Sequence, residues 1–248
     1  MKQLTRALRP LLIAFAWLLI WQIAAWAVGK EVKLPAPWRV LEALLSLAGQ
    51  GAFWLSLCAT LLRVLAAFLL GMLVGGLLGV LCTFAPWADA LLSPLRAVIK
   101  ATPITSFIVL VLLWLNKSMV PLFIALLMVV PIAWANVQQA LGAVSHQLLE
   151  MAYVFRLSRW DKILHIYLPS IMPQFVAAAT TALGFAWKSA AAAEVLARPE
   201  FSIGCGIMES KIYLETPELF AWTVAIILMS MALERLILHL LRLREARP

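Results

Sequence analysis

The ionisable residues Arg63, Lys188 and Glu194 lie within long apolar stretches of this sequence. A charge surrounded by hydrocarbon is costly, so such residues normally face the interior of a helix bundle or an aqueous path. We expect Lys188, Arg63 and Trp187 to line such a path, and a lysine there suits an anionic ligand. Glu194 is expected near the outer gate of the path. The alternative for both Lys188 and Glu194 is that the side chain reaches water at a membrane interface. The six-residue separation of Lys188 and Glu194 turns them to different sides of a helix, so no ion pair between them is expected.

Other residue types that catalyse reactions or bind metals do not form groups in the sequence. Cys58, Cys82 and Cys205 are odd in number, far apart and within or beside apolar runs, which argues against a disulfide framework or a metal site. The apolar runs contain no nucleophile, metal-binding or acid–base constellation, so the chain is not expected to be an enzyme. The phosphate-binding pattern G-x-x-x-x-G-K-[ST] is absent, so no cofactor is expected on this chain, ATP included.

The elements that must position the buried charges are membrane-spanning helices. Of 248 residues, 64% are hydrophobic and 13% are charged, which is more apolar surface than a soluble domain can bury. An apolar run of about 20 residues crosses a bilayer as a helix, which satisfies its own backbone hydrogen bonds. The net charge of +8 comes from basic residues scattered between these runs, so nucleic acid is not expected as a partner.

Six apolar runs divide the chain. They cover residues 11–28, 55–84, 104–115, 119–141, 169–197 and 219–241. We predict an all-α, polytopic membrane protein with six transmembrane helices, or five if the short run 104–115 is re-entrant or interfacial. Residues 1–248 are expected to form one transmembrane domain with core helices at about 55–241. The first run has some features of a signal peptide, but its length and the spans that follow favour a retained helix.

The distribution of basic residues predicts the orientation. With a cytoplasmic N-terminus, the loops 85–103 and 142–168 and the C-terminal tail lie inside. The inside set of basic residues is then Lys2, Arg6, Arg9, Arg96, Lys100, Arg156, Arg159, Lys162, Arg242, Arg244 and Arg247. The smaller outside set is Lys30, Lys33, Arg39, Lys117, Arg198 and Lys211. This asymmetry is typical of membrane proteins, so both termini are expected in the cytoplasm.

A polar stretch interrupts the apolar chain between Glu150 and Pro169. Spacings of three and four residues predict two short amphipathic helices within it. Their apolar faces are Leu148, Met151, Ala152 and Phe155, and then Trp160, Ile163, Leu164 and Tyr167. Between them, Ser158 and Asp161 form the pattern of a helix-start capping box. The stretch is either a solvated loop with interfacial helices or a docking surface for a cytoplasmic partner, and periodicity does not separate the two.

The same stretch resembles the cytoplasmic EAA loop of the integral membrane permeases of ABC importers. That loop has Glu and two small residues, a Gly after three further positions, and Ile-x-Leu-Pro after nine more. Here Glu150–Ala152 is followed by Arg156 at the glycine position and by Ile166–Pro169 without a gap. Arg156 and Arg159 replace glycines that are common in the nitrate, sulfonate and taurine branch, so the turn between the two short helices is expected to differ in geometry.

Resemblance to the nitrate, sulfonate and taurine branch extends over most of the chain. The matching stretches are LPAP at 34–37, the second apolar run at 60–79, KATP before the third run, AAEVL at 192–196 and SIGCGI at 202–207. WLNKS at 114–118 departs from the usual Trp-Phe-Gly run. These departures leave the solute open between a sulfonate-, nitrate- or taurine-like molecule and another small organic molecule such as a vitamin precursor.

The resemblance implies a type I ABC importer permease fold in the bacterial inner membrane. The implied partners are a cytoplasmic ATPase dimer that binds ATP and Mg, an extracytoplasmic binding protein, a second copy of the chain and membrane lipid. The loop at about 143–168 would dock on the ATPase. The residues that the resemblance assigns to this coupling are Glu150, Met151, Ala152, Phe155, Arg156, Leu157, Ser158, Arg159, Trp160, Asp161, Leu168 and Pro169. The rival class, an ion-coupled secondary transporter or channel, favours inverted repeats, and the sequence shows none that is convincing.

A stripe of glycines marks a close helix contact. Gly71, Gly75 and Gly79 recur every four residues in the second apolar run. Small residues at this spacing let another helix approach closely. Packing within one subunit is favoured over a seam between two copies.

Overall fold

The computed structural model describes residues 2–245 of the chain, with side chains described between 12 and 237. All secondary structure in this part of the chain is helical. The elements are α1 (Lys2–Val28), α2 (Pro37–Ala48), α3 (Gly51–Phe84), α4 (Pro86–Ala101), α5 (Ile104–Val111), α6 (Val120–Gly142), α7 (His146–Val154), α8 (Arg159–Lys162), the π-helical turn η1 (Ile163–Tyr167), α9 (Leu168–Ala197), α10 (Ile203–Ile212) and α11 (Thr216–Glu245).

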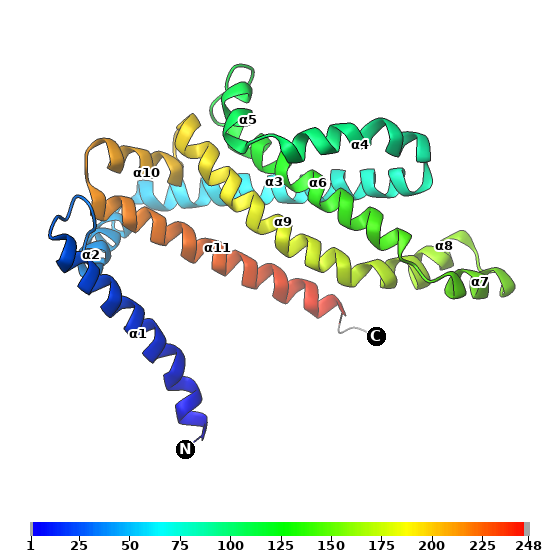
Figure 1. Cartoon of the computed structure of the whole chain (residues 1–248), viewed down its shortest axis with the longest axis horizontal. Coiled ribbons are helices and arrows are strands. Elements are labelled where there is room, and N and C mark those ends of the chain that lie inside the picture. Colours follow the sequence, from blue (N-terminus) through cyan, green and yellow to red (C-terminus); the bar gives the residue numbers. More distant parts are fainter. Residues whose placement is uncertain (1, 246–248) are drawn as a thin grey trace.

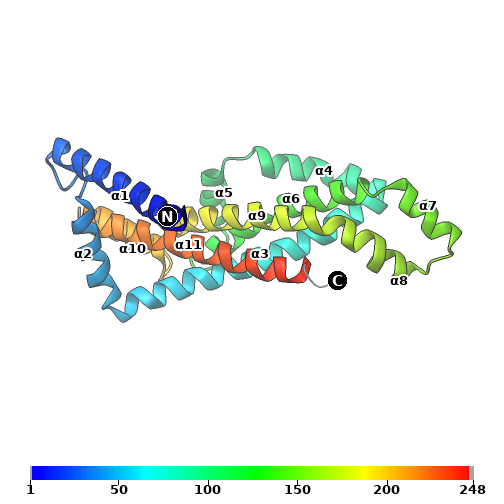
Figure 2. The same ribbon diagram turned by 90° about the horizontal axis from the view of Figure 1, so that it is seen from below.

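The long helices α3, α6, α9 and α11 form an elongated bundle (Figure 1). The helices α2 and α10 lie at one end of this bundle, and α7 and α8 lie at the other, in both ribbon views (Figures 1 and 2). The helix α1 joins the bundle at the α2 end, where the Trp21 ring lies 5.9 Å from that of Phe220 in α11. From there α1 diverges from the other helices (Figure 1).

Four helices in the described part of the chain are long and apolar enough to cross a membrane. They are Gly51–Phe84, Val120–Gly142, Arg159–Ala197 and Thr216–Ile237. The pair α4 and α5, bent by 102°, would give a fifth crossing, and Leu12–Val28 is a shorter apolar helix at the first predicted span. The prediction of an all-α, multi-pass membrane protein is confirmed. The short third run contains α5, which forms a bent pair with α4 instead of a straight crossing.

The close approach of α3 and α6 at the centre of the core depends on glycine. A Cβ atom at Gly71 would lie 2.6 Å from Val129 Cγ1, and one at Gly75 would clash with the backbone oxygen of Val130. Gly79 approaches α6 in the same way. The stripe therefore faces α6 of the same chain, as the sequence favoured, and any side chain larger than hydrogen would separate the two helices.

The prediction of a loop at 85–103 is wrong, because most of this segment forms the helix α4. This helix runs back along the bundle (Figure 1). Its side chains Asp89 and Arg96 form hydrogen bonds with a residue of α6. Arg96 donates a hydrogen bond of 2.6 Å to Gln138 and lies 4.7 Å from the centre of the Trp134 ring. Gln138 donates in turn to Asp89 at 2.9 Å. Polar residues that suggested a loop therefore belong to a helix packed on the bundle.

The second short helix predicted at 160–167 is not separate from the following span. The elements α8, η1 and α9 form one continuous helix of 39 residues. In η1 the Leu168 N–H donates to the Ile163 oxygen, and this wide turn accommodates Pro169, whose ring would clash in a regular α-helix. At about 1.5 Å per residue the helix is roughly 58 Å long, nearly twice the thickness of the hydrocarbon core of a bilayer, so it is longer than one crossing requires.

The orientation derived from basic residues stays a prediction. The side chains of several members of the inside set lie outside the described part of the chain: Lys2, Arg6, Arg9, Arg242, Arg244 and Arg247.

Candidate functional site

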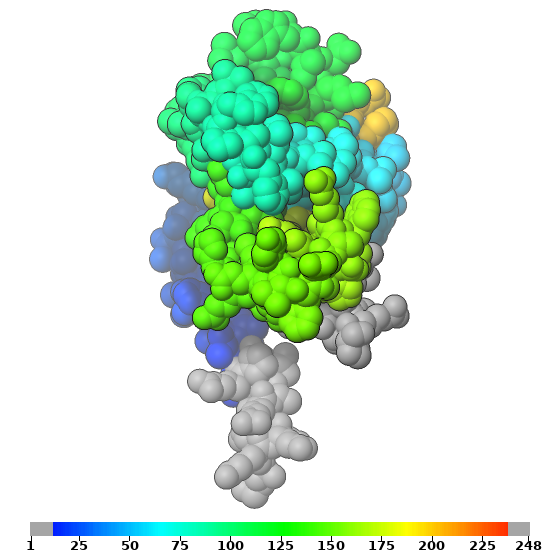
Figure 3. Space-filling model, turned by 90° about the vertical axis from the view of Figure 1, so that its right-hand side faces the viewer, coloured from blue at the N-terminus to red at the C-terminus, as the bar shows by residue number. Residues whose placement is uncertain are grey.

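The predicted coupling residues gather at the α7 end of the molecule. Ala152 and Ile166 are buried in a small apolar cluster that holds α7 against η1. The outward side of the same segment exposes large aromatic groups, because Tyr153, Phe155 and Trp160 are 79%, 72% and 74% exposed. Figure 3 faces this end and shows α7 and α8, in green and yellow-green, at the surface of the molecule. Exposed aromatic groups on a firmly held helix are typical of a contact surface.

We call Glu150, Tyr153, Phe155 and Trp160 the end surface. Glu150 is exposed and forms no ion pair within the described residues. The structure brings residues 150–161 together around α7 and the turn after it. Leu168 and Pro169 are also exposed but lie beyond η1, at the start of α9.

Arg156 adopts the backbone conformation that explains a glycine preference at its position. Its φ angle is 52°, in the left-handed region that an L side chain occupies only with strain. The Arg156 N–H donates to the Tyr153 oxygen, and the Leu157 N–H donates to the Ala152 oxygen, both at 3.0 Å. This pair of bonds is a Schellman ending of α7. The turn therefore has the left-handed geometry that glycine adopts readily, and the expected difference from relatives with glycine here stays a prediction.

The capping box predicted at Ser158 is confirmed. The Asp161 N–H donates to the Ser158 hydroxyl oxygen at 3.2 Å, and the Ser158 N–H donates to Asp161 Oδ2 at 3.3 Å. The Ser158 hydroxyl also donates to Asp161 Oδ2 at 2.6 Å, which holds the pKa of the Asp161 carboxyl below its ordinary value. The box starts the continuous α8–η1–α9 helix directly after the Schellman turn, so α7 is joined to α9 by two hydrogen-bonded turns.

Glu194 lies at the centre of a buried polar network near the α10 end of the bundle. Its side chain is fully buried and forms an ion pair of 3.0 Å with Arg63 of α3, whose side chain is 15% exposed. The Thr60 hydroxyl contacts both carboxylate oxygens, at 3.0 and 2.9 Å, and the Gly204 N–H donates to one at 3.2 Å. Glu194 therefore does not extend to water, and its charge is compensated within the chain.

The sequence identified Arg63 and Glu194 separately but not as a pair. Their partners Thr60 and Gly204 were missed as site residues. The signals that pointed to them were their places in the 60–79 and 202–207 stretches that resemble the transporter branch.

Lys188 is the exposed charge of α9. It forms no ion pair within the described residues, and Glu194 is paired elsewhere, as expected from their separation. Lys188 lines a pocket of about 380 Å³ between α9 and α11, together with Ser230 and Met231. Trp187 is buried beside it, and its indole N–H has no hydrogen-bond partner among the described residues. Of the sequence-predicted pathway residues, Lys188 alone presents an exposed charge.

Within the described residues, no group of three His, Cys, Asp or Glu side chains is placed to hold a metal ion. Two features remain: an exposed aromatic surface at one end and a lysine on the continuous helix that starts there.

Comparison with known proteins places the chain in a family. Residues 67–243 match the family described as binding-protein-dependent transport system inner membrane component. The chain is 24% identical over 221 residues to the taurine transport system permease protein TauC of Escherichia coli, covering 86% of this chain and 80% of that protein. It is 26% identical over 200 residues to the putative aliphatic sulfonates transport permease protein SsuC of Escherichia coli, covering 79% and 75%. It is 26% identical over 219 residues to the riboflavin transport system permease protein RibX of Chloroflexus aurantiacus, covering 87% and 81%.

Proposed function

This chain belongs to the family of binding-protein-dependent transport system inner membrane components and is an ABC importer permease, and we propose that it couples to a cytoplasmic ATPase through the end surface. Two copies would form the translocation pathway in the bacterial inner membrane. The ATPase would bind ATP and Mg, and a separate extracytoplasmic protein would deliver the solute. In this arrangement α7 faces the cytoplasm and α10 faces the outside.

The exposure of the end surface carries this proposal. Tyr153, Phe155 and Trp160 project from a segment that is itself fixed by Ala152 and the two hydrogen-bonded turns. Aromatic groups on a rigid support supply contact area at low entropic cost. A displacement of α7 by the ATPase would pass through the capping box into α8, and the continuous helix would carry it toward Lys188.

Co-purification tests this coupling. We expect Tyr153→Asp and Glu150→Lys to lose the ATPase from a tagged complex, because the first places a charge in an apolar contact and the second reverses a charge. Tyr213→Asp is the matched control, since Tyr213 is 73% exposed but lies at the other end of the bundle. Full recovery of the ATPase with both end-surface variants would refute the proposed docking.

The solute class follows from Lys188. An exposed ammonium group beside a mainly apolar pocket suits a small anionic or polar solute, as the names of the taurine and sulfonate relatives suggest. The riboflavin relative supports a vitamin-like alternative. Lys188→Met is expected to reduce uptake of a probe that carries a sulfonate group, such as taurine, without loss of the ATPase, while Lys211→Met on α10 leaves uptake unchanged. Unchanged uptake with Lys188→Met would remove this residue from the pathway.

A further inference from the structure

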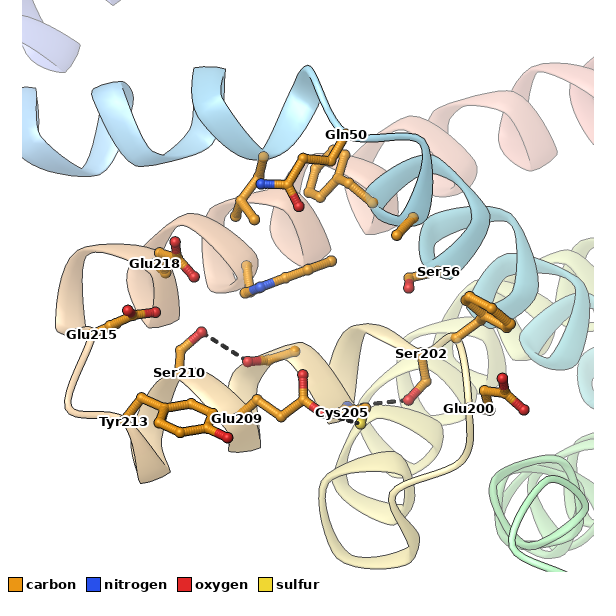
Figure 4. A pocket seen from close by; sticks show the side chains of 16 residues that line it. Gln50, Ser56, Glu200, Ser202, Cys205, Glu209, Ser210, Tyr213, Glu215 and Glu218 are labelled. Carbon is orange, nitrogen blue, oxygen red and sulfur yellow. Dashed lines mark hydrogen bonds between the residues drawn. The ribbon is translucent and has the colours of Figure 1, made fainter.

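A second pocket, of about 460 Å³, lies at the α10 end of the bundle, opposite the end surface (Figure 4). It is lined by residues of α2, α3, α10 and α11 and of the segment before α10. Phe53 and Trp222 are nearly buried in its wall, with ring centres 4.9 Å apart. Its volume falls within the range of small-molecule sites, which span about 300–1,000 Å³.

The pocket is strongly acidic. Four of the twelve acidic residues of the chain line it: Glu200, Glu209, Glu215 and Glu218. None of the lining residues is Lys or Arg, and none of the four carboxylates forms an ion pair within the described residues. In a chain with a net charge of +8, this is a concentrated negative region with no Lys or Arg among its lining residues.

A buried hydroxyl points into the same space. Ser56 is 7% exposed, and its hydroxyl group faces the pocket without a hydrogen-bond partner in the described chain (Figure 4). The Ser56 oxygen is not among the buried side-chain N and O atoms that lack a partner in the described chain, so it is open to the pocket itself. Ser56 therefore provides an acceptor for an N–H group that enters from outside the chain.

The walls of the pocket are held in place before any ligand arrives. Arg63 donates to the backbone oxygens of Phe201 and Glu200, at 3.2 and 3.3 Å, which fixes the segment before α10. The Gly204 N–H is bound by Glu194, which fixes the start of α10. A site with fixed walls loses little conformational entropy when it binds a ligand.

We infer that this pocket binds a cationic group, a primary ammonium or a guanidinium on a short apolar stem. The carboxylates would accept charge-assisted hydrogen bonds from the group. The faces of Phe53 and Trp222 would attract the cation and cover the stem. Ser56 would accept a further N–H at the inner wall. A free organic cation and a basic side chain of another protein carry the same chemistry.

Binding of labelled agmatine, which carries both groups, tests the inference in purified protein in lipid nanodiscs. We expect saturable binding that weakens at least about tenfold in the double variant Glu209→Gln/Glu215→Gln, because the loss of even one charge-assisted contact corresponds to about that factor. Ser56→Ala should weaken binding by a smaller factor. Glu234→Gln on α11, an exposed acid outside the pocket, is the matched control and should bind agmatine as the wild type does.

A blocked Gly-Arg-Gly tripeptide distinguishes the two sources. Binding of the tripeptide as strong as that of agmatine assigns the pocket to a protein side chain, and binding of agmatine alone assigns it to a free cation. Absence of saturable binding of both probes, or an equal loss in Glu234→Gln, overturns the inference. The assay needs no ATPase and no transport, so its failure leaves the proposed coupling untouched.

Discussion

Replacing Arg63 with methionine removes the cation that forms an ion pair with Glu194 in the described part of the chain. The carboxylate then keeps Thr60 and Gly204 as neutral donors but stays fully buried, because nothing else in the network moves it toward water. Breaking a buried ion pair from one side costs about 3–5 kcal/mol, so we expect a loss of about 3 kcal/mol or more in the free energy of unfolding. The variant also loses the two bonds from Arg63 to the segment before α10.

Unfolding by titration with a denaturing detergent in mixed micelles measures this loss. Thr60→Val is the matched control in the same network, and it should cost less, about 1.5–3 kcal/mol, because it removes a hydrogen bond to the carboxylate but leaves the ion pair with Arg63 in place. The double variant Arg63→Met/Glu194→Leu should be less destabilised than the sum of its single variants, since it leaves no unpaired charge. Equal costs for Arg63→Met and Thr60→Val, with additive effects in the double variant, would refute the account of the network.

Three further predictions concern the turn and the glycine stripe. Arg156→Gly should raise the free energy of unfolding by up to about 1 kcal/mol by relieving a left-handed residue, and Arg156→Val should lower it, as thermal unfolding of both variants would show. Gly75→Ala should cost about 1–3 kcal/mol through overpacking against α6, whereas Gly76→Ala, whose added Cβ meets nothing within 4 Å, should not destabilise the protein in the same assay. Titration of Asp161 by NMR should give a pKa below the ordinary value of an aspartate, and Ser158→Ala should raise that pKa. The capping box therefore stabilises the turn fully at pH values above the ordinary carboxyl pKa. This stabilisation is lost as the pH falls through the lowered pKa of Asp161. An unchanged Asp161 pKa in Ser158→Ala would contradict the capping geometry.

Local patterns in the sequence were enough to predict the helical runs, the capping box and the glycine contact. Each of these patterns can be recognised from the type and spacing of neighbouring side chains along one helix. Ser158 and Asp161 illustrate this, since both partners of the box are three positions apart.

Long-range partners explain what the sequence did not predict. Arg63 and Glu194 are 131 positions apart, and only the packing of α3 against α9 reveals their ion pair. The polar residues of α4 suggested a loop because Gln138, their partner on α6, is distant in the chain. The acidic pocket was missed for the same reason, since its carboxylates come from α10, α11 and the segments beside them.

Native mass spectrometry of the tagged complex, purified in lipid nanodiscs, tests the central claim most directly. We predict a mass equal to two copies of this chain plus two copies of an ATPase subunit, with the ATPase absent when the chain carries Tyr153→Asp. A preparation that transports solute but contains this chain alone would contradict the account and favour an ion-coupled transporter.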